Sequence, residues 1–206
     1  MKKKKNVFCL EGDWWNNLRK RSTVEPILDL LANAEGYRFD YIHLRVHNRT
    51  TFDQFVEKWT QKRYKDYPIL YLGFHGTEGQ LHISAASRSE NTVDLKEFSA
   101  QLEGKCEGRV IIFAGCSTVR VHGRKLKSFL DKTGALAVCG YVSTVDWILA
   151  TAFELILMQL LQSSAFTRPG LAAVQKKINK MIKTTSKTLG FRMVIKPRPK
   201  TRTKGR

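Results

Sequence analysis

Short apolar runs alternate with amphipathic stretches along most of the chain. Runs rich in β-branched and aromatic residues predict strands at residues 6–10, 37–46, 67–76, 110–116 and 135–142. Between them, apolar residues at helical spacing predict helices at about residues 22–36, 51–64, 93–102, 124–133, 145–161 and 171–189. A run at 191–195 is expected to add an antiparallel edge strand. This alternation predicts a three-layer α/β/α fold with a mostly parallel sheet of about five or six strands.

The pattern contains no internal repeat and no interdomain linker. Residues 1–195 are therefore expected to form a single α/β domain, a usual size for one hydrophobic core. Residues 196–206 contain no acid and almost no apolar side chain, and we expect a disordered basic tail there.

Positive charge is concentrated at the two ends. Four of the 18 net charges come from Lys2 to Lys5 and six from residues 196–206, so ten are terminal. Basic tails attract polyanions without selecting among them, so contacts with nucleic acid or another anionic surface are considered as partners. The alternative interpretation is a solubilising tail. Five further lysines are expected on the outer face of the last helix (Lys176, Lys177, Lys180, Lys183 and Lys187).

The cysteines and the apolar segments limit the compartment. The four cysteines show neither CxxC spacing nor a paired framework, which favours a reducing, cytoplasmic environment and excludes a zinc ribbon. The apolar run after the basic start is too short for a signal peptide. The segment 145–161 carries Asp146 and Glu154 and is shorter than the roughly 20 residues of a spanning helix, so no transmembrane segment is expected.

Two of the predicted strands end in residues that carry chemistry. The run from Val110 to Ala114 is followed by Gly115 and Cys116, and the run from Ile69 to Phe74 is followed by His75 and Gly76. Parallel strands present their carboxyl ends at one edge of the sheet, where ligand sites lie. Neighbouring strands would place Cys116 beside His75. Taken alone, each residue fits a structural role, because free cysteines are usually buried.

The pair supports nucleophilic catalysis. A cysteine attacks carbonyl groups as its thiolate, and His75 is the candidate general base and acid. The backbone N–H groups of Gly76 and of Cys116 itself are candidates for an oxyanion hole. No metal-ligand spacing and no phosphate-binding loop is found, so neither a metal nor a cofactor is expected.

In these motifs the chain resembles the caspase-like cysteine peptidases, including bacterial CHAT-type members. The resemblance covers residues 7–161 in the order and spacing of elements. It implies the caspase-hemoglobinase sheet with strand order 2-1-3-4-5, and hydrolysis of a protein or peptide substrate by a dyad of Cys116 and His75. The Gln-Ala-Cys-Arg-Gly and Ser-Ala-Cys-Glu signatures are both absent. Substrate preference therefore does not carry over, and an activating partner protein is a further expectation.

The resemblance also implies where the side chain before the cleaved bond, the P1 residue, would bind. The segments that match are 11–15 and 140–147, which contain Asp13, Trp14, Asp146 and Trp147. Asp13 and Asp146 would favour a basic P1 residue, and the tryptophans would either wall the pocket or simply close the core. For Asp146 the favoured alternative is that it caps the helix that follows.

Three functions are compatible with the sequence. The first is a caspase-like cysteine endopeptidase. The second is a non-catalytic caspase-like or flavodoxin-like binding module whose basic tails contact polyanions. The third is a hydrolase of non-peptide esters or amides that uses the same dyad.

Overall fold

The fold is built on a six-stranded sheet. The structure is a computed structural model and describes residues 5–17, 19–20, 22–34, 39–84 and 89–198. The strand order is β2-β1-β3-β7-β8-β9; all neighbours are parallel except β8 and β9. The bounds are β1 Val7–Glu11, β2 Tyr41–Arg45, β3 Ile69–Gly73, β7 Val110–Phe113, β8 Ala137–Tyr141 and β9 Phe191–Ile195. The predicted mostly parallel sheet, its order and its antiparallel edge strand are confirmed.

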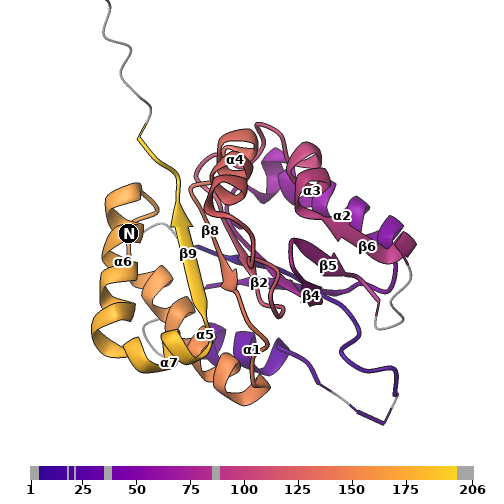
Figure 1. The fold of residues 1–206 in the computed structure, drawn as a ribbon, viewed down its shortest axis with the longest axis horizontal. Helices are drawn as coiled ribbons and strands as arrows, with labels where there is room; N and C mark the ends of the chain where they lie inside the picture. The colour runs from indigo at the N-terminus through magenta and orange to yellow at the C-terminus, as the bar shows by residue number, and fades with distance from the viewer. Residues whose placement is uncertain (1–4, 18, 21, 35–38, 85–88, 199–206) are drawn as a thin grey trace, which may run out of the picture.

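Helices cover both faces of this sheet (Figure 1). One layer holds α1 Glu25–Asn33, α5 Trp147–Ser163, α6 Arg168–Met181 and α7 Lys183–Thr188. The other holds α2 Arg49–Thr60, α3 Leu95–Gln101 and α4 Gly123–Thr133. Two short 3-10 helices, η1 Lys62–Tyr64 and η2 Ser89–Asn91, lie in the connections. The three-layer prediction is therefore confirmed.

The sheet separates two hydrophobic cores. In β3, Tyr71 belongs to the core under α1 and α5, whereas Leu70 and Leu72 belong to the core under α2, α3 and α4. Both faces are covered, which explains why β1, β3, β7 and β8 read as continuous apolar runs rather than alternating ones.

Some element boundaries differ from the sequence prediction. Residues 92–94 form strand β6 (Thr92–Asp94) rather than the start of a helix, because the Asp94 carboxylate accepts from the Lys96 N–H and caps α3. With β4 His75–Thr77 and β5 Gln80–His82, β6 forms a small antiparallel sheet. The predicted helix at 171–189 is two helices, interrupted at Ile182, where φ is −136°.

Ser22 and Glu25 have the spacing of a capping box, which predicts that they cap the helix that follows, but the start of α1 differs from this prediction. The cap residue is Val24, whose side chain accepts no hydrogen bond from the helix. Instead, the backbone N–H of Val24 donates to the carboxylate of Glu11 at 2.9 Å. A carboxylate from β1 thus satisfies the amino end of α1 and stabilises it through the helix dipole.

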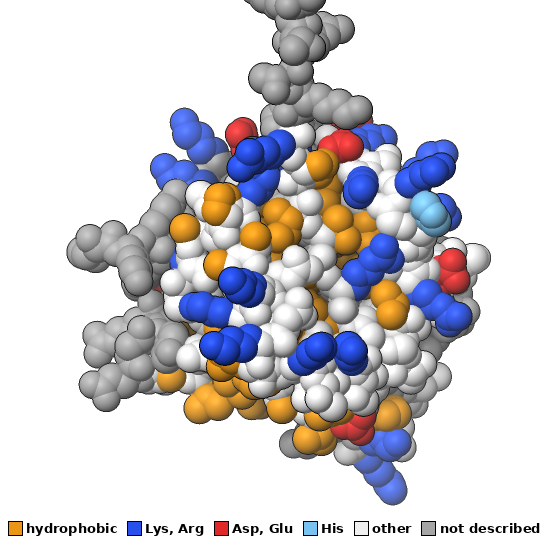
Figure 2. Space-filling view, turned by 60° about the vertical axis from the view of Figure 1, so that its left-hand side comes forward, with side chains coloured by type: hydrophobic (Ala, Val, Ile, Leu, Met, Phe, Trp, Pro, Cys, Tyr) orange, Lys and Arg blue, Asp and Glu red, His pale blue; other side chains and the backbone are white. Residues whose placement is uncertain are grey.

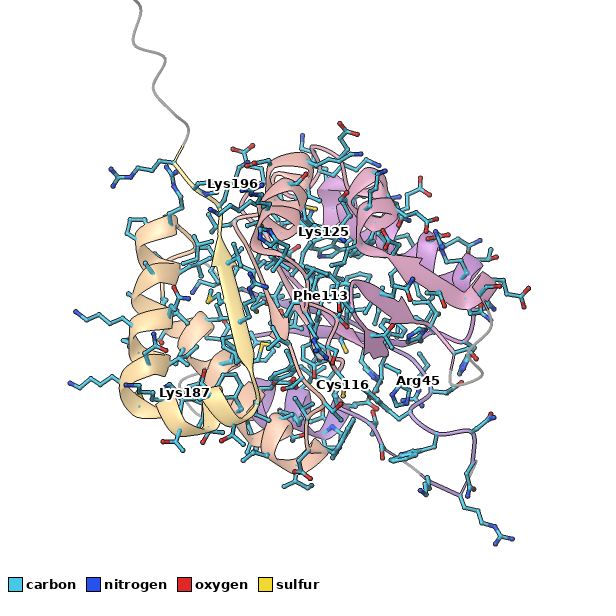
Figure 3. All side chains as sticks on the ribbon, in the orientation of Figure 1. Arg45, Phe113, Cys116, Lys125, Lys187 and Lys196 are labelled. Carbon is cyan, nitrogen blue, oxygen red and sulfur yellow. The ribbon has the colours of Figure 1, made fainter. Side chains whose placement is uncertain are left out.

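The parallel strands all point to one edge of the sheet. Figure 3 shows Cys116 and Arg45 at this edge and Lys196, which follows the antiparallel strand β9, at the opposite one. Within the described residues, the longest apolar helices fall short of what crossing a membrane requires.

Candidate active site

The segments that follow β3 and β7 are in close contact. The two strands are paired in parallel, with Leu72 opposite Phe113. A Cβ atom on Gly115 would lie 2.1 Å from the Phe74 carbonyl oxygen, and one on Gly76 would lie 2.6 Å from the Cys116 carbonyl oxygen. Only glycine permits this approach of the two backbones. The contact places His75, the first residue of β4, and Cys116 on neighbouring segments.

His75 and Cys116 line one cavity of about 140 Å³. Two tryptophans form part of its wall: the Trp14 ring meets the Trp147 ring edge to face at 4.7 Å and the His75 ring at 5.4 Å. The remaining lining comes from the residues after β1 and β7, from β3, from the start of α1 and from α5 and the residues before it (Trp15, Val24, Tyr71, Ala114, Val145, Ala150, Thr151 and Glu154). Most of these side chains are apolar, so the thiol and the imidazole lie in a largely apolar cavity.

The His75 ring has a defined partner on one side. Its Nε2 lies 2.7 Å from the carbonyl oxygen of Trp14. A carbonyl only accepts, so Nε2 carries the hydrogen. In the neutral ring Nδ1 is then the unprotonated nitrogen, which is the atom able to take a proton from a nucleophile. The backbone after β1 therefore selects the tautomer that a general base requires.

Cys116 differs from the other three cysteines. Cys9, Cys106 and Cys139 are buried, whereas Cys116 is partly exposed. Burial raises the pKa of all three buried thiols, that of Cys106 to about 12. The Cys116 sulfur accepts a hydrogen bond from the Val145 N–H at 3.5 Å.

The backbone beside Cys116 is unusual as well. Ser117 has a φ of 54°, and it is the one described non-glycine residue with a positive φ. Such conformations are costly and concentrate at functional sites. No hydrogen bond joins the Cys116 sulfur to the His75 ring among the residues that the structure describes. Dyads without substrate are often open in this way and tighten when substrate binds.

A buried acid, Glu11, holds Trp14 in place and was missed by the sequence reasoning. Its carboxylate accepts from Trp14 Nε1 at 2.5 Å and from Thr23 Oγ1 at 2.7 Å, and it pairs with Arg45 at 3.0 Å and His43 at 2.7 Å. Burial works to raise the pKa of Glu11, but hydrogen bonds led by that of His43 lower it below its ordinary value. The signal in the sequence was an acid at the end of an otherwise apolar strand.

A second missed acid lies in the cavity. Glu154 on α5 is 5% exposed, and its carboxyl group accepts hydrogen bonds from Tyr71 Oη at 2.5 Å and Tyr141 Oη at 2.8 Å. Burial raises the pKa of Glu154 to about 7, against the lowering effect of the two hydroxyls. The sequence showed it only as one charge in an apolar helix.

The four residues expected to bind substrate are divided between two environments. Trp14 and Trp147 line the cavity. Asp13 lies outside its lining and forms ion pairs with His47 at 2.9 Å and Arg45 at 3.4 Å. Asp146 also lies outside it and accepts from the Leu149 N–H at 2.8 Å, so the capping interpretation is confirmed.

Metal-binding groups and the basic residues were also considered in the sequence. In the part of the chain it describes, no group of three or more His, Cys, Asp or Glu side chains is placed to hold a metal ion. The five lysines of α6 and α7 are exposed as predicted, and Figure 2 shows Lys and Arg side chains spread over this side of the molecule. Lys2 to Lys4 and residues 199–206 lie outside the described residues.

Comparison with solved structures shows that the fold is similar to that of caspases. The chain is similar to the crystal structure of caspase-1 from Spodoptera frugiperda, with a TM-score of 0.54 and 13% identity over 94% of this chain and 87% of that one. It is also similar to a structure of pro-sf-caspase-1, with a TM-score of 0.51 and 9% identity over 99% and 88%. The likeness shows that the fold is caspase-like.

Comparison of sequences gives a family. No curated protein matches the chain. A family model matches residues 4–195, nearly the whole chain. The chain therefore belongs to the family described as a family of unknown function (DUF6642).

Proposed function

We propose that the protein is a cysteine endopeptidase that cleaves peptide bonds with Cys116 as nucleophile and His75 as general base and acid. The observation that carries the proposal is the bond between His75 Nε2 and the Trp14 carbonyl. It leaves Nδ1 as the acceptor on a ring that lines the same cavity as the most accessible thiol. The caspase-like fold supports peptide bonds as the substrate class.

The reaction would proceed in two stages. Cys116 sulfur attacks the scissile carbonyl carbon, its proton passes to His75 Nδ1, and the carbonyl oxygen becomes an oxyanion. Backbone N–H groups of Gly76 and Cys116 would stabilise this oxyanion. His75 then protonates the leaving amine and a thioester remains. Water, deprotonated by His75, hydrolyses the thioester and restores the thiol.

Membership of the bacterial CHAT-type group stays a prediction, as do a cytoplasmic location, an activating partner protein and contacts of the basic tails with polyanions. The division into a domain at 1–195 and a tail at 196–206 also stays a prediction. Asp13 and Asp146, which the sequence assigned to a basic P1 residue, are occupied by ion pairs and by a helix cap. Residues that line the cavity itself are therefore the remaining candidates for recognition of the P1 side chain.

Labelling with peptide electrophiles tests the proposal. A set of peptidyl acyloxymethyl ketones with different P1 residues is incubated with the folded protein, and modified cysteines are mapped by mass spectrometry. We expect modification of Cys116 alone, because the other three thiols are buried. Cys116→Ala should abolish labelling and hydrolysis of fluorogenic peptides. A protein that folds but whose Cys116 reacts with no member of the set, and that cleaves no peptide, would contradict the proposal.

A further inference from the structure

One face of α5 lines the cavity beside Cys116. Trp147, Ala150, Thr151 and Glu154 are spaced by three and four residues, so they lie on the same side of the helix, and all four contribute to the cavity lining. Glu154 brings the one acidic side chain in that lining. The same lining includes the apolar or aromatic side chains of Trp14, Trp147, Val24, Val145 and Ala150.

Within the described part of the chain, Glu154 has no cationic partner. Tyr71 and Tyr141 donate one hydrogen bond each, whereas a carboxylate offers about four acceptor sites. Glu11, the other fully buried acid near the site, pairs with both His43 and Arg45. A carboxyl group buried without a counter-ion is costly to ionise, and such groups concentrate at functional sites. A positively charged group of a bound ligand could therefore act as the counter-ion of Glu154.

We propose that this cavity receives a lysine or arginine side chain at the P1 position of the substrate, and that Glu154 is the residue that selects it. The inference rests on the proposed peptidase function and gives its substrate class. Glu154 is a specificity-determining residue here and takes no part in bond breaking.

Geometry supports the P1 position. The carbonyl attacked by Cys116 belongs to the P1 residue, so the P1 side chain starts within a few bonds of the sulfur. The cavity that holds Cys116 and His75 has about 140 Å³, the volume of about five water molecules. That is the scale of one extended side chain and is small for a drug-sized ligand.

The chemistry of the lining supports a long cation. The methylenes of lysine or arginine would pack against the rings of Trp14 and Trp147, which both line the cavity, as such stems do against apolar surface. The charged end would reach Glu154, where the remaining acceptor sites are free of protein donors among the described residues. An acidic P1 side chain would be repelled, and an apolar one would leave the buried carboxylate unpaired.

Fluorogenic peptides that differ only at P1 (Lys, Arg, Leu, Gln or Asp) test the inference. For the unmodified protein we expect kcat/KM to be highest with Lys or Arg. Glu154→Gln keeps the shape of the side chain and removes its charge; its single carbonyl oxygen still accepts from one of the two tyrosine hydroxyls. It should therefore lower kcat/KM for Lys and Arg by about 10-fold to 100-fold. The values for Leu and Gln should change by less than about threefold.

Asp146→Asn is the matched control, because asparagine also caps helices and the change removes a carboxylate outside the cavity. It should leave the P1 preference unchanged. Thr151→Lys is the second variant: it places a lysine one turn from Glu154, which should pair with the carboxylate, fill the cavity and abolish the preference for Lys and Arg. Thermal unfolding reports whether each variant is folded, as does alkylation by iodoacetamide, which in a folded variant is confined to Cys116 because the other three thiols are buried.

The outcomes separate the two proposals. Hydrolysis without preference for Lys or Arg, or a preference that survives both Glu154→Gln and Thr151→Lys, overturns the role of Glu154 and leaves the peptidase function standing. No hydrolysis of any peptide and no labelling of Cys116 by any P1 electrophile overturns both. Loss of the basic preference in folded Glu154→Gln with the control unchanged supports the inference.

Discussion

The Nε2 atom of His75 lies 2.7 Å from the carbonyl oxygen of Trp14. This bond joins the segment after β1 to the start of β4. A backbone carbonyl thus orients the ring and selects its tautomer, a task that many hydrolases assign to a carboxylate. The chain needs no acidic partner for His75, which agrees with the absence of an obvious acid beside it in the sequence.

The bond predicts different results for two substitutions of His75. Gln can donate its side-chain amide to the Trp14 carbonyl but has no basic nitrogen, so His75→Gln should retain the fold and lose about 10²-fold to 10⁴-fold in kcat/KM. His75→Ala should lose at least as much. Hydrolysis of a fluorogenic peptide and near-UV circular dichroism provide the measurements. Activity of a folded His75→Gln protein within about tenfold of the unmodified one would remove His75 from the mechanism.

Glu11 is predicted to support the site from a distance. It bonds the Trp14 indole, whose backbone carbonyl holds His75. Glu11→Gln removes the charge that pairs with His43 and Arg45 and should cost about 2 kcal/mol or more in the free energy of unfolding, since these bonds are buried and charge-assisted. kcat should fall as Trp14 loses its anchor. Urea unfolding at pH 7 and the kinetic constants measure both effects.

The control for Glu11 is Asp13→Asn. Asp13 also pairs with Arg45, but its side chain is 39% exposed, so the loss should be about 0 to 1 kcal/mol. Equal losses in the free energy of unfolding for Glu11→Gln and Asp13→Asn would show that the buried interactions of Glu11 stabilise the fold no more than the exposed ion pairs of Asp13. A large loss of stability with unchanged kcat would show that Glu11 does not position the site.

The contact between the two glycine-containing segments predicts a steric effect. In Gly115→Ala the new methyl group would lie 2.1 Å from the Phe74 carbonyl oxygen, so the backbone next to Cys116 must move. We expect a loss of about 1 to 3 kcal/mol and of most activity. Gly123→Ala is the matched control, because its methyl group meets only the end of the Arg192 side chain at 3.1 Å. Similar stability and activity of the two variants would contradict this account of the contact.

The parts of the fold that the sequence predicted are those encoded by local pattern. Strands buried on both faces read as apolar runs, so β1, β3, β7 and β8 were recognisable. The cap at Asp146 depends on three residues of chain and was also recognisable. The β4-β5-β6 sheet was missed in part because each strand has three residues, too few to show a period.

The parts of the site that were missed depend on distant partners. Glu154 is held by Tyr141, 13 residues before it, and by Tyr71, 83 residues before it. In the sequence it interrupts an apolar helix without explanation. Likewise, Glu11 bonds Thr23, which precedes α1, and His43 and Arg45, which both lie on β2. Cys116 and His75 were found because each follows an apolar strand, a signal that Glu154 lacks.

Glu154 also predicts how stability depends on pH. Burial raises the pKa of its carboxyl group from 4.5 to about 7 in the folded protein. The folded state therefore binds more protons than the unfolded state between these values. Stability from this group is fully present below about pH 4.5 and is lost as pH rises to about 7, by on the order of 3 kcal/mol. Glu154→Gln should remove this fall, as measured by urea unfolding across the range.

Four groups that interact with Glu154 do not titrate in this pH window. Tyr71 and Tyr141 contact it, and burial raises the pKa of both phenols; Cys9 and Cys139 face it, with thiol pKa values also raised by burial. All four stay neutral up to pH 7. Glu11 acts in the opposite direction and at lower pH, since its pKa is lowered and its contribution is lost as pH falls below 4.5. Plots of unfolding free energy against pH that stay parallel for the unmodified and Glu154→Gln proteins would contradict the assignment.

Because ionised Glu154 would pair with a P1 cation, KM for Lys and Arg peptides should fall between pH 6 and 8, whereas KM for Leu peptides should not.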